Sequence, residues 1–257
     1  MASPNSKTNV IKEIYQALFK RFGPQNWWPA DTAFEVIVGA VLTQNTNWKN
    51  VEKAIVNLKQ ENCLSIDRMQ KISLEQLARM IKPAGYFNVK AKRLKNVVGF
   101  ILERYNGSIT AMHKQQTDVL REELLSINGV GPETADSILL YALNKSVFVV
   151  DAYTRRFMVR HNLVSAKAEY HDIQKLFSNA LSDEKKCFNE YHALIVKLAK
   201  DFCKTVPQCE QCPLSKIHYN RLNRCQNCYR SFLRGEKRFG GKNASQETVC
   251  LSCKSQK

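Results

Sequence analysis

A pair of glycines between two helical patterns constrains the fold of this chain more than any other feature. In LLSINGVGPETADSILLYA, residues 124–142, apolar residues recur at helical spacing on both sides of Gly129-Val130-Gly131. Glycine permits positive φ angles and a close approach of backbones, and Pro132 suits the first position of the second helix. The pattern therefore predicts two helices joined by a tight hairpin.

Such a hairpin has the chemistry to hold a phosphate. The first N–H groups of a helix have no partner within the helix and lie at the positive end of its dipole. They can bind the phosphates of the DNA backbone without reading its sequence. Gly129, Val130, Gly131 and Thr134 are the candidates for this contact. Taken by itself, the motif fits an ordinary turn between two helices equally well.

The remaining chain has a helical pattern almost throughout, which predicts an all-α fold. Helical spacing covers 7–22, two segments within 34–59, and about 74–81, 89–104, 117–126, 132–143, 151–161, 170–181 and 185–203. Only SVFVVD, residues 146–151, is typical of an extended segment. With 257 residues, of which 44% are hydrophobic, the chain can form one large domain or two modest ones.

The charge of the chain indicates a polyanionic partner. The formal net charge is +16, and each phosphate that such a surface neutralises releases counterions. The longest apolar run, FEVIVGAVL (34–42), is too short to span a bilayer. The first ten residues have no apolar segment typical of a secretory signal. We expect a cytoplasmic, nucleoid-associated protein that binds nucleic acid and no membrane.

The cysteines predict metal in the C-terminal part. The chain has nine cysteines, most of them near the C-terminal end, and clustered cysteines in a reducing compartment usually hold metal. Cys225, Cys228, Cys250 and Cys253 have the paired spacing of a four-cysteine zinc site. Because the tail, residues 219–257, has few apolar residues, we expect it to fold only with this metal.

A longer stretch resembles a known family. LLSINGVGPETADSILLYALNKSVFVVDAYTRRF, residues 124–157, resembles the helix-hairpin-helix base-excision glycosylases of the endonuclease III superfamily. VLTQNT (41–46) and AGYFNVKAKRL (84–94) are similar to other segments of that family. The resemblance covers about residues 30–215.

This resemblance implies a two-lobed, all-α fold with a small metal-bound tail. A six-helix domain with the hairpin would span 30–140, and a second lobe would combine 1–29 with 141–218. The tail would be a zinc module of its own. The implied partner is double-stranded DNA with damaged bases, and we expect a monomer.

Asp151 is the implied catalytic residue, because the family has an essential aspartate at the start of the helix that follows the hairpin. Cleavage of an N-glycosidic bond builds positive charge on the sugar. A carboxylate stabilises this charge and can orient or deprotonate water. From its position alone, Asp151 could equally be a helix N-cap.

The residue at position 133 distinguishes glycosylases that also cut the DNA backbone from those that do not. Family members that also cut the DNA backbone carry a lysine at this position, and its amine forms a Schiff base with the sugar. Glutamate cannot do so, and a glycosylase without lyase activity is therefore implied. Adenine-excising relatives carry a glutamate where this chain has Ala40, which disfavours that branch.

The first tryptophans indicate the base that would be excised. NWWPA (26–30) and TQNTNW (43–48) most resemble the 3-methyladenine DNA glycosylase III branch. The implied base pocket consists of Trp28, Pro29 and Trp48, with Glu133 at its edge. N3-alkylated adenine is cationic, and tryptophan faces attract cations. Alternatively, the tryptophans are core and interface residues.

Three further residues are implied DNA contacts. Gln44 matches a residue that fills the space left by the flipped base, and Tyr86 lies where a wedge residue opposes it. Lys90 is a candidate phosphate contact. All three are also compatible with an ordinary solvated surface.

The second cysteine group resembles an iron–sulfur loop. Cys203-x5-Cys209-x2-Cys212 is similar to the C-x6-C-x2-C-x5-C loop of endonuclease III relatives, but the first spacer is one residue short. The fourth position holds His218, and a histidine can ligate iron or zinc. The three cysteines, with His218 or Cys225 as the fourth ligand, would therefore bind a 4Fe-4S cluster or a second zinc ion. Alternatively, the loop has lost its metal.

These features predict a DNA glycosylase that flips out and excises alkylated purines. Two alternatives stay open. One is a uracil or thymine mismatch glycosylase, and the other is a DNA-binding module without catalysis.

Overall fold

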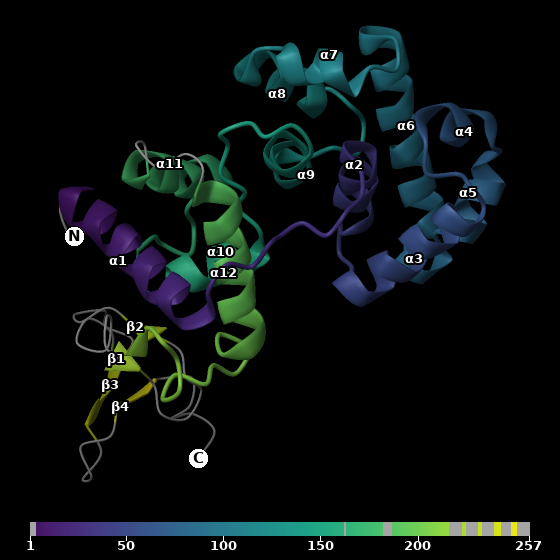
Figure 1. Cartoon of the computed structure of the whole chain (residues 1–257). Helices are drawn as coiled ribbons and strands as arrows, with labels where there is room; N and C mark the ends of the chain where they lie inside the picture. Colours follow the sequence, from purple (N-terminus) through teal and green to yellow (C-terminus); the bar gives the residue numbers. More distant parts are fainter. Residues whose placement is uncertain are drawn as a thin grey trace. The chain divides into compact units, whose positions relative to one another are not determined.

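The computed structural model describes residues 4–161, 163–181 and 187–215, together with the backbone of four short strands further along the chain (Figure 1). The chain divides into two compact units. One is Trp28–Val149, and the other combines Met1–Trp27 with Val150–Lys257.

The unit Trp28–Val149 is helical. Its helices are α2 (Ala33–Leu42), α3 (Trp48–Gln60), α4 (Ile66–Lys71), α5 (Leu74–Met80), η1 (a 3₁₀ turn, Lys82–Ala84), α6 (Phe87–Tyr105), α7 (Ile109–Lys114), α8 (Thr117–Leu125), α9 (Pro132–Ser137) and η2 (a π-helix, Ile138–Ala142).

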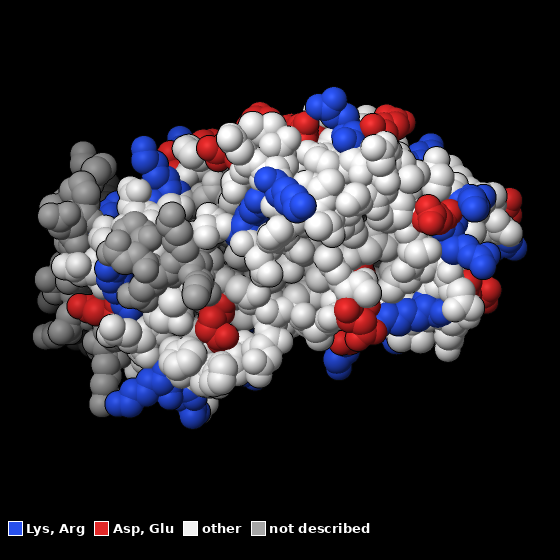
Figure 2. All heavy atoms as spheres, turned by 45° about the horizontal axis from the view of Figure 1, so that its top comes forward, with Lys and Arg blue, Asp and Glu red and all other residues white. Residues whose placement is uncertain are grey.

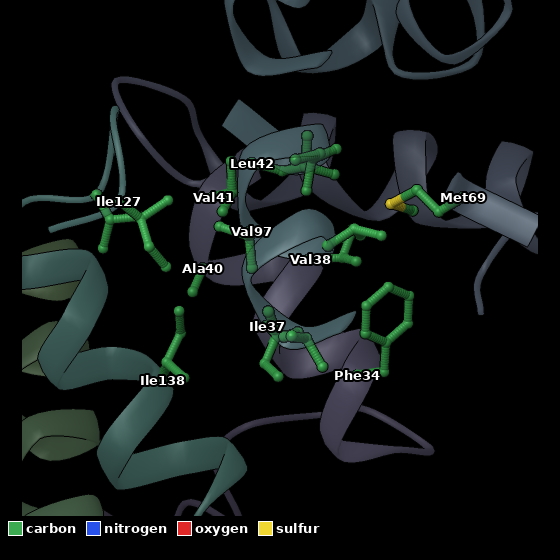
Figure 3. Packing of buried hydrophobic residues seen from close by; sticks show 14 of the residues in the cluster. Phe34, Ile37, Val38, Ala40, Val41, Leu42, Met69, Val97, Ile127 and Ile138 are labelled. Carbon is green, nitrogen blue, oxygen red and sulfur yellow. The ribbon is translucent and has the colours of Figure 1, made fainter. Parts of the chain in front are cut away.

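The core of this unit forms around α2. Every residue from Phe34 to Leu42 is buried, so this helix is apolar on all sides rather than amphipathic. Figure 3 shows Ala40 of α2 facing Ile127 and Ile138, with Met69 on another side of the helix. The helices α3, α6, α9 and η2 all pack against α2. A central helix of this kind fixes the positions of the loops at both of its ends.

Helix caps fix where these helices begin. The Thr32 side chain accepts a hydrogen bond from the backbone N–H of Glu35, and Asn47 caps α3 in the same way. Ser73 and Gln76 form a reciprocal capping box on α5. Because Asn47 caps α3, the segment between α2 and α3 is a short, defined loop.

The second unit is also built mainly from helices. Its elements are α1 (Pro4–Phe22), α10 (Ala152–Arg160), α11 (Tyr170–Ala180), α12 (Cys187–Asp201), and the strands β1 (Asn223–Arg224), β2 (Ser231–Phe232), β3 (Phe239–Lys242) and β4 (Thr248–Cys250). α12 packs against α1 and α10, and the buried Tyr191 hydroxyl donates a 2.8 Å hydrogen bond to the Ile11 carbonyl.

The predicted all-helical fold is confirmed for the described residues up to position 215. The strands β1–β2 and β3–β4, which form two antiparallel pairs in the tail, were not predicted. The segment 146–151 has no regular secondary structure, although Phe148, Val149 and Val150 are buried. The helix predicted over 132–143 is α9 followed by the π-helix η2. None of the helices described here is long and apolar enough to cross a membrane.

Candidate active site

The hairpin between α8 and α9 depends on one of its two glycines. Gly129 has φ +94°, and a Cβ there would lie 2.3 Å from Cγ of Arg93. Gly131 has φ −98°, and its Cβ would meet nothing within 4 Å. The Asn96 side chain donates a 3.0 Å hydrogen bond to the Asn128 carbonyl and so braces the turn from α6. Positive φ and close packing therefore require glycine at position 129.

Gln44 contacts this hairpin directly. Its Nε2 donates hydrogen bonds to the Gly129 carbonyl (3.0 Å) and to Oγ1 of Thr134 (2.9 Å). Its Oε1 accepts a hydrogen bond from Nη1 of Arg93. The structure thus brings together Gln44, Gly129 and Thr134, three predicted DNA-contacting residues. Arg93, which sequence reasoning missed, completes the network.

Tyr86 is highly accessible. It is 72% exposed, has φ +44° and is the N-cap residue of α6. A left-handed conformation is uncommon for a bulky residue, and such strain persists only where the surroundings enforce it. The ring lies in the open, as a residue that enters DNA requires.

Lys90 is buried, and the structure does not support its predicted phosphate contact. Only 1% of the residue is exposed, and its ammonium group donates to the Leu42 carbonyl, the Ala84 carbonyl and Oγ1 of Thr46. Burial, with a smaller contribution from the positive charge of Arg93, lowers the pKa of Lys90 to about 8. A lysine within a basic run is usually solvated, which is why the sequence pattern was misleading.

Three aromatic side chains meet at one end of α2. The rings of Trp28 and Trp48 pack edge to face, with centroids 5.1 Å apart and planes at 86°. Tyr141 packs on Trp28 at 5.2 Å. Trp28 lies against α2 because position 39 is glycine, where a Cβ would come within 3.1 Å of the indole ring. The two tryptophans form a corner, which Tyr141 of the π-helix η2 supports.

The two other predicted pocket residues are exposed. Pro29 follows Trp28 directly, and Glu133 lies in the first turn of α9. The backbone carbonyl of Glu133 accepts a 2.7 Å hydrogen bond from Ser137.

Asp151 is the N-cap of α10 in the second unit. Its Oδ1 accepts a 2.6 Å hydrogen bond from the backbone N–H of Thr154. The preceding N–H, of Val150, donates to the Tyr170 hydroxyl at 3.2 Å and so holds the chain before the aspartate. The cap fixes the rotamer of the carboxylate and keeps Oδ2 available for another partner.

That partner is His192 of α12. Its Nε2 lies 3.5 Å from Oδ2 of Asp151, and both side chains are largely buried. Burial alone would raise the pKa of Asp151. The neighbouring His192 and the hydrogen bond from Thr154 outweigh burial and hold this pKa below its ordinary value. The carboxylate is therefore ionised at neutral pH.

Arginines surround the first cysteine of the predicted iron–sulfur loop. Nε of Arg156 donates to the Cys203 carbonyl at 2.9 Å, and Nη1 of Arg160 lies 3.3 Å from Sγ of Cys203. Within the described residues, no group of three or more His, Cys, Asp or Glu side chains is placed to hold a metal. The role of Cys203, Cys209 and Cys212 as metal ligands stays a prediction.

The other predicted ligands cannot be compared with the structure. His218, Cys225, Cys228 and Cys253 lie outside the described residues, and only the backbone of Cys250 is described.

Basic and acidic side chains alternate on one face of the molecule. On the face drawn in Figure 2, the described Lys and Arg side chains form several separate groups, with Asp and Glu side chains between them.

Comparison with known proteins agrees with this geometry. The HhH-GPD superfamily of base excision DNA repair proteins matches residues 38–182, which include the hairpin and Asp151. The chain belongs to this superfamily. It is thus a DNA glycosylase of the HhH-GPD base excision repair family.

Three HhH-GPD relatives illustrate the match. A protein of Methanocaldococcus jannaschii, whose name assigns it provisionally to the DNA repair glycosylases, is 50% identical over 82% of this chain and 97% of its own length. The H. pylori 3-methyladenine DNA glycosylase MagIII, bound to 1,N6-ethenoadenine, is 29% identical, with a TM-score of 0.66 over 76% of this chain and 97% of its own. An endonuclease III in a non-covalent complex with DNA is 21% identical, with a TM-score of 0.72 over 85% of this chain and 96% of its own, and shows the shared fold.

Proposed function

We propose that this HhH-GPD glycosylase flips out alkylated purines, 3-methyladenine above all, and cleaves their glycosidic bond by hydrolysis. The aromatic corner of Trp28 and Trp48 is the observation that carries this proposal. An N3-alkylated adenine carries a positive charge, and tryptophan faces stabilise cations. The similarity to MagIII, which its name describes as a 3-methyladenine glycosylase, supports the same substrate class.

The cationic base also explains a site with little acid catalysis. The glycosidic bond breaks with its electron pair moving onto the base, which neutralises the charge of the alkylated ring. No protonating residue is needed for such a leaving group. The sugar becomes positively charged, and the ionised Asp151 stabilises this charge. The carboxylate also orients the water that adds to C1′ and accepts the proton that this water loses. Burial raises the pKa of Asp151, and His192, 3.5 Å away, lowers it.

We infer that the enzyme lacks lyase activity. Glu133 lies in the first turn of α9, where lyase members of the family carry the lysine nucleophile. A carboxylate has no amine with which to form a Schiff base. The product would therefore be an abasic site in an intact strand.

We propose two kinds of DNA contact, one to the phosphate backbone and one inside the duplex. The N–H of Val130 is used within the turn, where it donates to the Ile127 carbonyl at 3.0 Å. The N–H groups of Gly129 and Gly131, with Thr134, would hold a phosphate without reading sequence. Gln44 and Tyr86 would enter the duplex from loops of the same unit, Gln44 to fill the space left by the base and Tyr86 to oppose it. These contacts offset the few kcal/mol that unstacking a base costs.

A release assay tests the substrate. Purified protein is incubated with DNA methylated on its purines and, separately, with an oligonucleotide that contains uracil opposite guanine. Release of 3-methyladenine without release of uracil supports the proposal. Uracil excision alone would favour a mismatch glycosylase, and binding without release from either substrate would favour a module without catalysis.

We further propose that the tail binds zinc through Cys225, Cys228, Cys250 and Cys253, whose paired spacing carries this inference. Metal analysis of protein purified without oxygen tests the tail. Zinc that is lost after Cys225→Ser supports the site, and protein that folds without any metal overturns it.

A further inference from the structure

Lys90 is a buried cation whose three hydrogens are all used. Nζ donates to the Leu42 carbonyl at 2.8 Å, to the Ala84 carbonyl at 2.8 Å and to Oγ1 of Thr46 at 2.6 Å. An ammonium group has three donors, so its hydrogen bonding is complete. Burying a charge is costly unless it is compensated in this way. The arrangement is therefore a built site within the unit Trp28–Val149.

The three acceptors come from two different loops. Leu42 ends α2 and Thr46 lies in the segment before α3, whereas Ala84 ends η1. The Thr46 hydroxyl also donates to the Ala84 carbonyl at 2.5 Å, so the two loops are joined both directly and through Lys90. One side chain of α6 thus fixes the spacing between them.

Each of these loops carries a residue proposed to enter DNA. Gln44 lies between Leu42 and Thr46, and Tyr86 is two residues after Ala84. Both loops also contain a left-handed residue, Asn45 with φ +51° in the first and Tyr86 itself with φ +44° in the second. Backbone in this region is strained for residues other than glycine, and surrounding contacts must hold it.

We propose that Lys90 is a positioning residue that holds the Gln44 loop and the Tyr86 loop at the separation required to enter DNA from both sides of the flipped base. The proposal rests on the roles proposed above for Gln44 and Tyr86. Lys90 does not touch DNA. Its contribution is to keep both loops preorganised, so that little ordering is left to occur on the DNA.

The test measures the affinity for a duplex that lacks one base, rather than base excision. One probe is a duplex with a single tetrahydrofuran abasic analogue, in which the base is already missing. The other is the same duplex with an ordinary nucleotide at that position. The ratio of the two dissociation constants isolates the contribution of the residues that fill the gap. General damage to folding or to the hairpin weakens both affinities and leaves the ratio unchanged.

Two variants remove the link between the loops. Lys90→Met retains the apolar stem and removes the charge, and Thr46→Val removes the bridging hydroxyl at nearly constant shape. We expect each variant to lower the preference for the abasic-analogue duplex by about tenfold, as we expect for Gln44→Ala and Tyr86→Ala. Thr46→Ser should restore the preference. Lys53→Met, which removes an exposed charge from α3, is the matched control and should leave the ratio unchanged.

The outcomes are distinguishable. If Gln44→Ala and Tyr86→Ala lower the ratio but Lys90→Met does not, Lys90 has no positioning role. Should Lys90→Met fail to fold, judged by circular dichroism, Thr46→Val and its rescue by Thr46→Ser decide the question in the same way. If Gln44→Ala and Tyr86→Ala both leave the ratio unchanged, their proposed roles fail and the role of Lys90 fails with them.

Discussion

Nε2 of His192 lies 3.5 Å from Oδ2 of Asp151, in a largely buried position at the start of α10. Burial raises the pKa of Asp151, and the neighbouring His192 lowers it, so that the pKa lies below its ordinary value. Nothing in the spacing of the sequence connects the two residues, because α12 brings the histidine to the aspartate only through tertiary packing.

The first prediction concerns the pH dependence of excision. Asp151 must be ionised to stabilise the sugar cation, and its pKa is held below the ordinary value of 3.8. His192→Gln removes the opposing charge, so the pKa of Asp151 should rise. The acid limb of the single-turnover rate should then move to higher pH. His171→Gln, an exposed histidine of α11, is the control, and identical acid limbs in both variants would exclude His192 from this role.

The lowered pKa of Asp151 also makes the stability of the fold depend on pH. A carboxyl group with a depressed pKa in the folded state stabilises the fold above its unfolded pKa, and the contribution is lost as the pH falls through the folded value. Asp151 should therefore stabilise the protein at neutral pH, and this contribution should be lost in acid, as the pH falls below 3.8 and through the folded pKa.

The second prediction concerns the hairpin. Gly129→Ala would place a Cβ 2.3 Å from Arg93 in a left-handed conformation, so we expect it to lower the free energy of unfolding by about 1–3 kcal/mol. Gly131→Ala has open space and an ordinary φ, and should change stability by less than about 0.5 kcal/mol. Chemical denaturation of both variants measures the difference. Equal effects would mean that the turn adapts and that glycine is not required at position 129.

The third prediction concerns the aromatic corner. Trp48→Leu and Trp28→Leu should each reduce 3-methyladenine release by about tenfold or more, because stacking on the cationic base is lost. Trp48→Phe, which keeps a ring, should retain more activity than Trp48→Leu. Circular dichroism checks the fold. Normal release by both leucine variants would make the tryptophans structural only.

Sequence alone predicts the parts of this molecule that depend on local chemistry. The hairpin follows from Gly129 and Pro132, and the position of Asp151 at a helix start follows from its capping chemistry. Lys90 could not be predicted, because a basic run gives no sign that one member is buried among carbonyls. The π-helix η2 could not be distinguished from an α-helix either, since both bury the same apolar spacing, yet it carries Tyr141.

The fourth prediction concerns Glu133. Borohydride added during the reaction should trap no covalent complex with DNA, because no amine is available at this position. A trapped adduct would show that another lysine acts as nucleophile. Glu133→Lys supplies the missing amine and serves as a comparison, since adduct formation in that variant alone would place residue 133 next to the sugar.

The most direct test of the whole account is 3-methyladenine release by Asp151→Asn. The amide keeps the shape of the cap but cannot carry the negative charge that stabilises the sugar cation. We predict a loss of single-turnover release by roughly two orders of magnitude or more, with affinity for the abasic-analogue duplex retained. Near-normal release by Asp151→Asn would contradict the assignment of the catalytic carboxylate and, with it, the proposed mechanism.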